Sequence, residues 1–133
     1  MDMLVSHMGG MRFQAETNGH VVITGENEDD TDGPRGMWPG ELFVAALGMC
    51  IAGYVVGFCN NHGLPYEGIT VELARVHAQS PSRIENVEVR IRLPELPSER
   101  EQKAIIRAAD LCYVTQSINN GMTVKVSLVS ETG

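Results

Sequence analysis

Three segments of the chain alternate apolar and polar residues, which is the pattern of a strand with one face in a core. In residues 11–23 the dipeptide Asn18-Gly19 supplies the positive backbone angles of a tight hairpin turn. Residues 69–93 contain two further alternating runs with turn residues between them, and residues 122–128 alternate again. The sequence therefore predicts two hairpins, the second with one solvated face, and a final strand.

Two other segments have the composition of helices. From Pro39, residues 42–59 form a run of apolar residues and glycine, and Gly63 suits the left-handed position after a helix. A helix that is apolar all round is a buried one. Ser98 and Glu101 have the spacing of a capping box, and apolar residues follow at helical spacing. These positions are Ile105, Ala108, Ala109 and Cys112.

The order ββ-α-ββ-α-β predicts an α+β fold. We expect a single domain over residues 11–130, preceded by a flexible leader over residues 1–10. A core of this size is stable only if another part of the protein or a second chain covers its outer apolar face. We therefore expect the protein to form oligomers.

The apolar run reaches the lower limit for a membrane span, and Gly53 and Gly57 have the spacing of a membrane-helix contact. However, no Lys/Arg cluster flanks the run, and the half-solvated sheet needs a cover. We expect a buried helix of a soluble protein and no membrane partner. Gly48, Gly53 and Gly57 would then allow close packing against another backbone, such as that of a second copy.

Charge and cysteine content narrow the function classes. Ten Lys+Arg against 17 Asp+Glu give a net charge of −7, which disfavours nucleic acid as a partner. Three cysteines do not form an even disulfide framework, and residues 1–11 contain no secretory signal, so we expect a cytoplasmic protein. The four histidines are scattered, and the acidic residues 26–33 match a calcium loop only in part. We expect neither a metal nor a cofactor.

The cysteines are the main candidates for chemistry. Cys50 in the apolar helix and Cys112 on the apolar face of the second helix should both point inward and could meet. Cys59 is nine residues after Cys50 and should face the opposite way. Two interpretations follow. The thiols are small apolar residues that fill the core, or they are a peroxidatic thiol with a resolving thiol.

Two motifs around these cysteines resemble those of the OsmC / organic hydroperoxide resistance (Ohr) family. The first runs from Pro39 through Glu41 and Gly48 to Cys50, and the second covers residues 108–114 about sixty residues later. Residues 63–71 resemble the family's segment that precedes a strand pair, and the resemblance covers residues 11–130. It implies an intertwined homodimer with the helices between two sheets and a site at the dimer interface. It also implies reduction of organic hydroperoxides by peroxidatic Cys50 and resolving Cys112, with a dithiol as reductant.

The sequence departs from the Ohr branch at the residues that hold the reactive thiolate, and is closer to the OsmC-like branch. In the Ohr branch these residues are an Arg in the first hairpin turn and a Glu directly after the helix proline. Here residues 16–19 contain no Arg, and Gly40 follows Pro39. Glu41 resembles a first-turn residue favoured by the helix dipole. Burial among apolar side chains disfavours a thiolate, so a cation is needed. Arg35 is the first candidate and Arg12 the second.

We therefore predict a cytoplasmic thiol peroxidase that acts on organic hydroperoxides. Two alternatives remain open at this point. One is a dimer on the same fold that binds a small ligand or senses redox state without turnover. In the other, the cysteines only pack the core.

Overall fold

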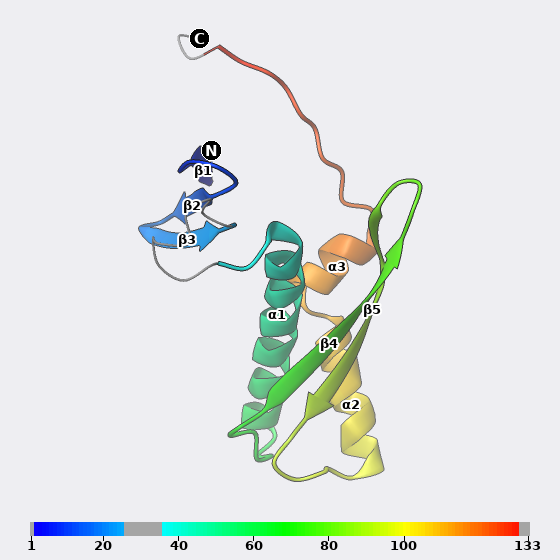
Figure 1. Cartoon of the computed structure of the whole chain (residues 1–133). Helices are drawn as coiled ribbons and strands as arrows, with labels where there is room; N and C mark the ends of the chain where they lie inside the picture. Colours follow the sequence, from blue (N-terminus) through cyan, green and yellow to red (C-terminus); the bar gives the residue numbers. More distant parts are fainter. Residues whose placement is uncertain (1, 26–35, 131–133) are drawn as a thin grey trace. The chain divides into compact units, whose positions relative to one another are not determined.

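The computed structural model describes residues 2–25 and 36–130. The described elements follow one another as strands and helices of a mixed α+β fold, as predicted (Figure 1). In chain order they are β1 (Leu4–His7), β2 (Phe13–Thr17), β3 (His20–Thr24), α1 (Pro39–Asn61), β4 (Thr70–Ala78), β5 (Arg83–Arg92), α2 (Glu99–Asp110) and α3 (Tyr113–Asn119).

The chain divides into two compact units, residues 1–46 and residues 47–133, where the sequence predicted one domain over residues 11–130. The first unit contains the β1-β2-β3 sheet and the second contains the β4-β5 hairpin with α2 and α3. Helix α1 starts in the first unit and continues into the second. The two sheets are separate, because the strands of each pair only among themselves.

In the first unit, β2 and β3 form the predicted hairpin, with Asn18 and Gly19 at φ of 50° and 77° in its turn. Leu4–His7, which were predicted to lie in a flexible leader, pair with β2 as strand β1. Gly9 and Gly10 have positive φ, and the N–H of Met8 donates to the Arg12 carbonyl at 2.9 Å. A turn at these glycines thus returns the chain onto β2, which the expectation of a flexible leader over residues 1–10 did not include.

Helix α1 begins and ends as the sequence predicts. Pro39 is its first residue, where the missing N–H costs nothing. At the other end Gly63 has a φ of 67°, and the Leu64 N–H donates to the Cys59 carbonyl at 2.9 Å. This is the bond by which a left-handed glycine closes a helix.

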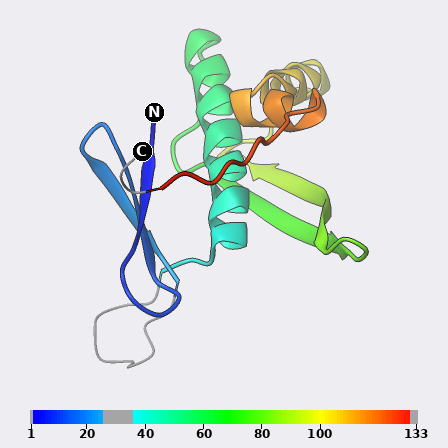
Figure 2. The same ribbon diagram turned by 90° about the horizontal axis from the view of Figure 1, so that it is seen from above.

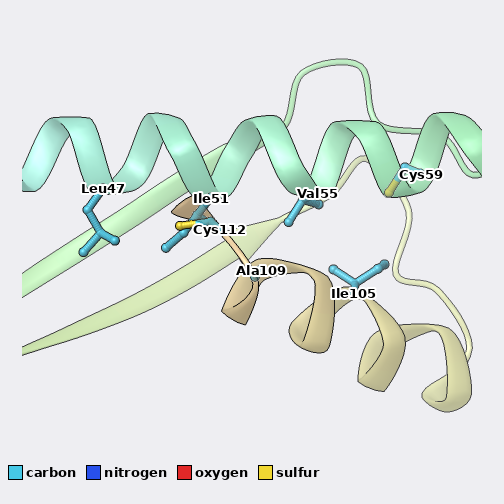
Figure 3. Packing of buried hydrophobic residues seen from close by; sticks show 7 residues of the cluster. All are labelled: Leu47, Ile51, Val55, Cys59, Ile105, Ala109 and Cys112. Atoms are coloured by element: carbon cyan, nitrogen blue, oxygen red, sulfur yellow. The ribbon is translucent and has the colours of Figure 1, made fainter. Parts of the chain in front are cut away.

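The core of the second unit lies between α1, α2 and the β4-β5 hairpin (Figure 2). One stripe of α1 faces the inner side of α2 (Figure 3). The buried members of this core cluster are Leu47, Ile51, Val55, Cys59, Ile105, Ala109 and Cys112. The hairpin covers them with half-buried side chains, namely Leu73, Val87, Val89 and Ile91. Its exposed face carries Glu72 and Arg92, which form an ion pair at 2.7 Å. The predicted solvated face is confirmed.

Helix α1 is not buried all round within this chain. Met49 is 68% exposed, and Phe43 and Tyr54 are also exposed. A Cβ on Gly48 would meet the Leu73 side chain at 2.6 Å, so this glycine allows close packing inside the chain. Gly53 and Gly57 have nothing within 4 Å of such a Cβ. By length and composition α1 could also cross a membrane, but core helices of soluble proteins pass the same test.

The C-terminal part of the chain differs from the prediction in two places. The apolar spacing predicted a second helix that continues through Cys112, but α2 stops at Asp110, and α3 starts after Cys112. Cys112 is extended, at φ −61° and ψ 143°, because its thiol accepts the hydrogen bond that starts α3. Residues 122–130 form no strand and are exposed throughout, since no neighbouring strand in the described chain accepts their ladder bonds.

Helix α2 starts with the predicted capping box. The Glu101 N–H donates to the Ser98 hydroxyl at 3.2 Å, and the Ser98 N–H donates to the Glu101 carboxylate at 3.1 Å. These hydrogen bonds and the charge of His62 lower the pKa of Glu101. Because the pKa is lowered on folding, this contribution is present at neutral pH and is lost as the pH falls through the lowered value.

We expect Ser98→Ala to lower the free energy of unfolding by about 1 kcal/mol, the usual cost of losing a helix N-cap. Ser98→Thr is the matched control, because threonine retains the hydroxyl. Urea unfolding at neutral pH measures both variants. Equal destabilisation by Ala and Thr would show that the cap contributes nothing.

Candidate functional site

The structure brings Cys50 and Cys112 together. Cys50, half-buried on α1, packs against the core cluster that contains Cys112. The two side chains are close enough for a hydrogen bond that acts on the Cys112 thiol. Cys112 is 0% exposed, so Cys50 is the more accessible sulfur of the pair. The structure thus places the two cysteines near each other in the fold, while their roles stay a prediction.

Thr115 holds the Cys112 sulfur from the other side. The Thr115 N–H donates to Cys112 Sγ at 3.3 Å, and Thr115 Oγ1 lies 2.9 Å from the same sulfur. Both contacts follow from the local chain path, because Cys112 is the N-cap of α3 and Thr115 is its third residue. Thr115 was not among the residues predicted from the sequence. The signal that could have found it is a hydroxyl residue three positions after a cysteine at a helix start.

Opposing effects act on the Cys112 thiol. Burial acts to raise its pKa, since a thiolate loses its hydration there. Hydrogen bonds from the Thr115 side chain and N–H, from Cys50 and from the Val114 N–H act the other way. Together they lower the pKa of Cys112 below the usual value. The thiolate therefore forms more readily than in an ordinary cysteine at the sulfur that the sequence assigned to the resolving role.

Cys59 has a different environment. It is 0% exposed and packs in the core cluster beside Val55 and Ile105, two turns further along α1 than Ile51 (Figure 3). Burial, and next the negative charge of Glu101, raise the pKa of Cys59. A protonated, buried thiol is a poor nucleophile. Cys59 therefore fits the role of a small apolar core residue.

The predicted supporting residues have different outcomes. Glu41 accepts a hydrogen bond from the Trp38 N–H at 2.9 Å, so its carboxylate caps the start of α1. Arg12 lies in the turn before β2, in the first unit, whereas Cys50 belongs to the second. Its role towards Cys50 stays a prediction. Arg35 lies outside the described residues, as does the acidic segment 26–33.

Among residues 2–25 and 36–130, no set of three or more His, Cys, Asp or Glu side chains could hold a metal ion. The chemistry that this part of the molecule presents is a pair of thiols. Two neighbouring thiols can form a disulfide when an oxidant converts one of them to a sulfenic acid.

Several solved structures share the fold of this chain. No curated protein matches the chain. Among solved structures, a protein of Psychrobacter arcticus whose name links it to osmotic stress and the detoxification response is 22% identical, with a TM-score of 0.76 over 88% of this chain and 87% of that one. The OsmC-like protein of Mycoplasma pneumoniae is 14% identical, with a TM-score of 0.69 over 89% and 86%. The organic hydroperoxide resistance protein OhrB of Bacillus subtilis is 17% identical, with a TM-score of 0.59 over 88% and 90%.

These likenesses concern the fold, and a family model adds a direct match in sequence. The model of the OsmC-like protein family matches residues 27–127, which include both Cys50 and Cys112. The match covers more than half of the chain. The protein belongs to the OsmC-like family.

Proposed function

We propose that the protein is a thiol peroxidase that reduces organic hydroperoxides with Cys50 and Cys112. The observation that carries this proposal is the position of Cys50, which packs against the core cluster that contains Cys112 and acts on the Cys112 thiol. Family membership supports it, because structures of the same fold include proteins named for organic hydroperoxide resistance. A redox role in stress is the broader function.

Exposure assigns the roles within the pair. Cys50 is the more accessible sulfur, so it attacks the outer oxygen of the hydroperoxide, releases the alcohol and becomes a sulfenic acid. Cys112, which is fully buried beside it, then attacks the Cys50 sulfur. A disulfide forms and water is released. An external dithiol exchanges with the disulfide and restores both thiols.

The surroundings of the pair favour organic over inorganic peroxides. Cys112 belongs to an apolar cluster that contains Ile51 and against which Val114 packs. An alkyl or aryl tail buried there gains about 25 cal/mol per Å² of apolar surface, whereas hydrogen peroxide has no tail to bury.

One equivalent of cumene hydroperoxide should convert Cys50 and Cys112 into an intramolecular disulfide that dithiothreitol reverses. The measurement is the intact mass before and after peroxide, with the linked peptides identified after digestion. The expected change is the loss of two hydrogens, with Cys59 unmodified. A protein that neither loses hydrogens nor gains oxygen on Cys50 would contradict the peroxidase. A dimer that binds a ligand without turnover would then be the better account.

We also propose that the working form is a cytoplasmic homodimer in which the chains intertwine. Two apolar surfaces support a second copy as the partner. One is the outer face of α1 around Met49 and Tyr54, where Gly53 and Gly57 leave open space. The other is the exposed C-terminal segment, whose alternating residues have the pattern of a strand that lacks a neighbour. Three cysteines without a disulfide fit a reducing compartment.

A further inference from the structure

The groups around Cys112 donate hydrogen bonds to its sulfur, and the assignment of Cys112 as the resolving thiol does not by itself account for them. The Thr115 and Val114 N–H groups can only donate, so they favour the negative form of the sulfur that they contact. The Thr115 hydroxyl, 2.9 Å from Cys112 Sγ, can donate as well, and Cys50 supplies a fourth hydrogen bond. A buried thiol that serves only as core packing needs none of them.

We propose that Thr115 is a positioning residue that holds Cys112 as a thiolate, ready to attack the sulfenic acid of Cys50. This inference rests on the proposed peroxidase and specifies how its second step is made fast. The thiolate, rather than the thiol, is the nucleophile in disulfide formation. Without Thr115, the apolar surroundings of Cys112 would keep it protonated and slow that step.

The groups that face Cys112 come from several elements. Three other titratable side chains belong to or pack against its cluster, namely Cys50 and Cys59 of α1 and Tyr66 before β4. The causes that act on the pKa of Cys112 are burial and hydrogen bonds. Of the three titratable side chains, Cys50 is the one that acts on the Cys112 thiol directly. Among the described residues, hydrogen bonds therefore lower the pKa of Cys112, an effect that a nearby cation has at other reactive cysteines.

The step balances without a further reactant. The Cys112 thiolate gives an electron pair to the sulfur of the Cys50 sulfenic acid. The S–S bond forms, the S–O bond breaks, and hydroxide leaves and combines with the proton that the Cys112 thiol released on ionising, which gives water. Cys50 is reduced from the sulfenic to the disulfide level, and Cys112 is oxidised from the thiolate to the same level. Thr115 keeps its proton throughout, since it donates only a hydrogen bond.

The first test measures the thiolate without any peroxide. In a protein that carries Cys50→Ser and Cys59→Ser, Cys112 is the remaining thiol, and its ultraviolet thiolate absorbance can be titrated against pH. We expect Thr115→Val, which removes the hydroxyl at nearly constant volume, to move the titration to higher pH. Thr115→Ser, the matched control, should leave it close to that of the parent. An unchanged titration in Thr115→Val would overturn the inference.

The second test follows the reaction in the protein with all three cysteines. After one equivalent of cumene hydroperoxide, Thr115→Val should form the sulfenic acid at the parent rate, and the disulfide about tenfold more slowly at neutral pH, the usual weight of a hydrogen bond to a charged group. Dimedone trapping of the sulfenic acid and the mass of the disulfide report the two steps. The difference should vanish at alkaline pH, where both proteins carry the thiolate. A deficit of equal size at every pH would mean a merely structural role.

The outcomes separate this inference from the proposed function. If no sulfenic acid forms on Cys50, the peroxidase is wrong, while the titration still decides whether Thr115 holds a thiolate. If the sulfenic acid forms and Thr115→Val resolves it at the parent rate at neutral pH, the peroxidase stands and the role of Thr115 is wrong. Thr115→Ala provides the same comparison if valine prevents folding.

Discussion

Cys50→Ser should abolish the consumption of organic hydroperoxide, with a loss of about a thousandfold or more, because a serine hydroxyl does not ionise at neutral pH and cannot replace the attacking sulfur. Cys112→Ser should act differently, since the buried partner is needed only after the first attack. It should stop turnover and leave Cys50 as a sulfenic acid, or as its more oxidised forms when peroxide is in excess. A coupled assay with dithiothreitol measures turnover, and mass spectrometry identifies the oxidised residue.

Cys59→Ser is the matched control for both variants. Cys59 is fully buried, its pKa is raised, and it lies two turns of α1 beyond Ile51, so we expect it to take no part in the reaction. The variant should retain turnover and lose about 1–3 kcal/mol of stability from burying a hydroxyl. Loss of activity in a folded Cys59→Ser protein, or a peroxidase that survives without Cys50, would mean that the three thiols have been assigned the wrong roles.

Two glutamates on one side of the C-terminal segment should convert the protein from dimer to monomer. Val124 and Val126 are 79% and 90% exposed in the isolated chain, although their alternation is that of a strand with a buried face. If a second copy covers this face, Val124→Glu combined with Val126→Glu would bury two unpaired carboxylates, which is strongly unfavourable. Sedimentation velocity at micromolar concentration measures the change.

The matched control places the same charges on the other side of the segment. Thr123→Glu combined with Ser127→Glu changes the net charge equally but leaves the apolar positions intact. This protein should remain a dimer. Monomers in both double variants would indicate that charge alone separates the copies. A stable monomer of the parent protein at the same concentration would remove the dimer and the interface site together.

Elements with local causes could be predicted from the sequence. The β2-β3 hairpin depends on Asn18-Gly19, α1 on an apolar run closed by Gly63, and the start of α2 on the Ser98–Glu101 capping box. In each case the residues that specify the element are neighbours along the chain, so propensity and spacing suffice. The family motifs likewise identified both Cys50 and Cys112 before any geometry was known.

Contacts between residues that are distant in the sequence determined the features that local patterns did not predict. Leu4–His7 became a strand because β2 offers them hydrogen bonds, and residues 122–130 form none because no described strand does. The amphipathic pattern through Cys112 predicted one continuous helix, but the hydrogen bond from Thr115 to the thiol starts a second one. The acidity of Cys112 also depends on Cys50, which is 62 residues away in the sequence and adjacent in the fold. A sequence determines which side chains can ionise, whereas their pKa depends on burial and on hydrogen-bond donors that only the tertiary structure brings together.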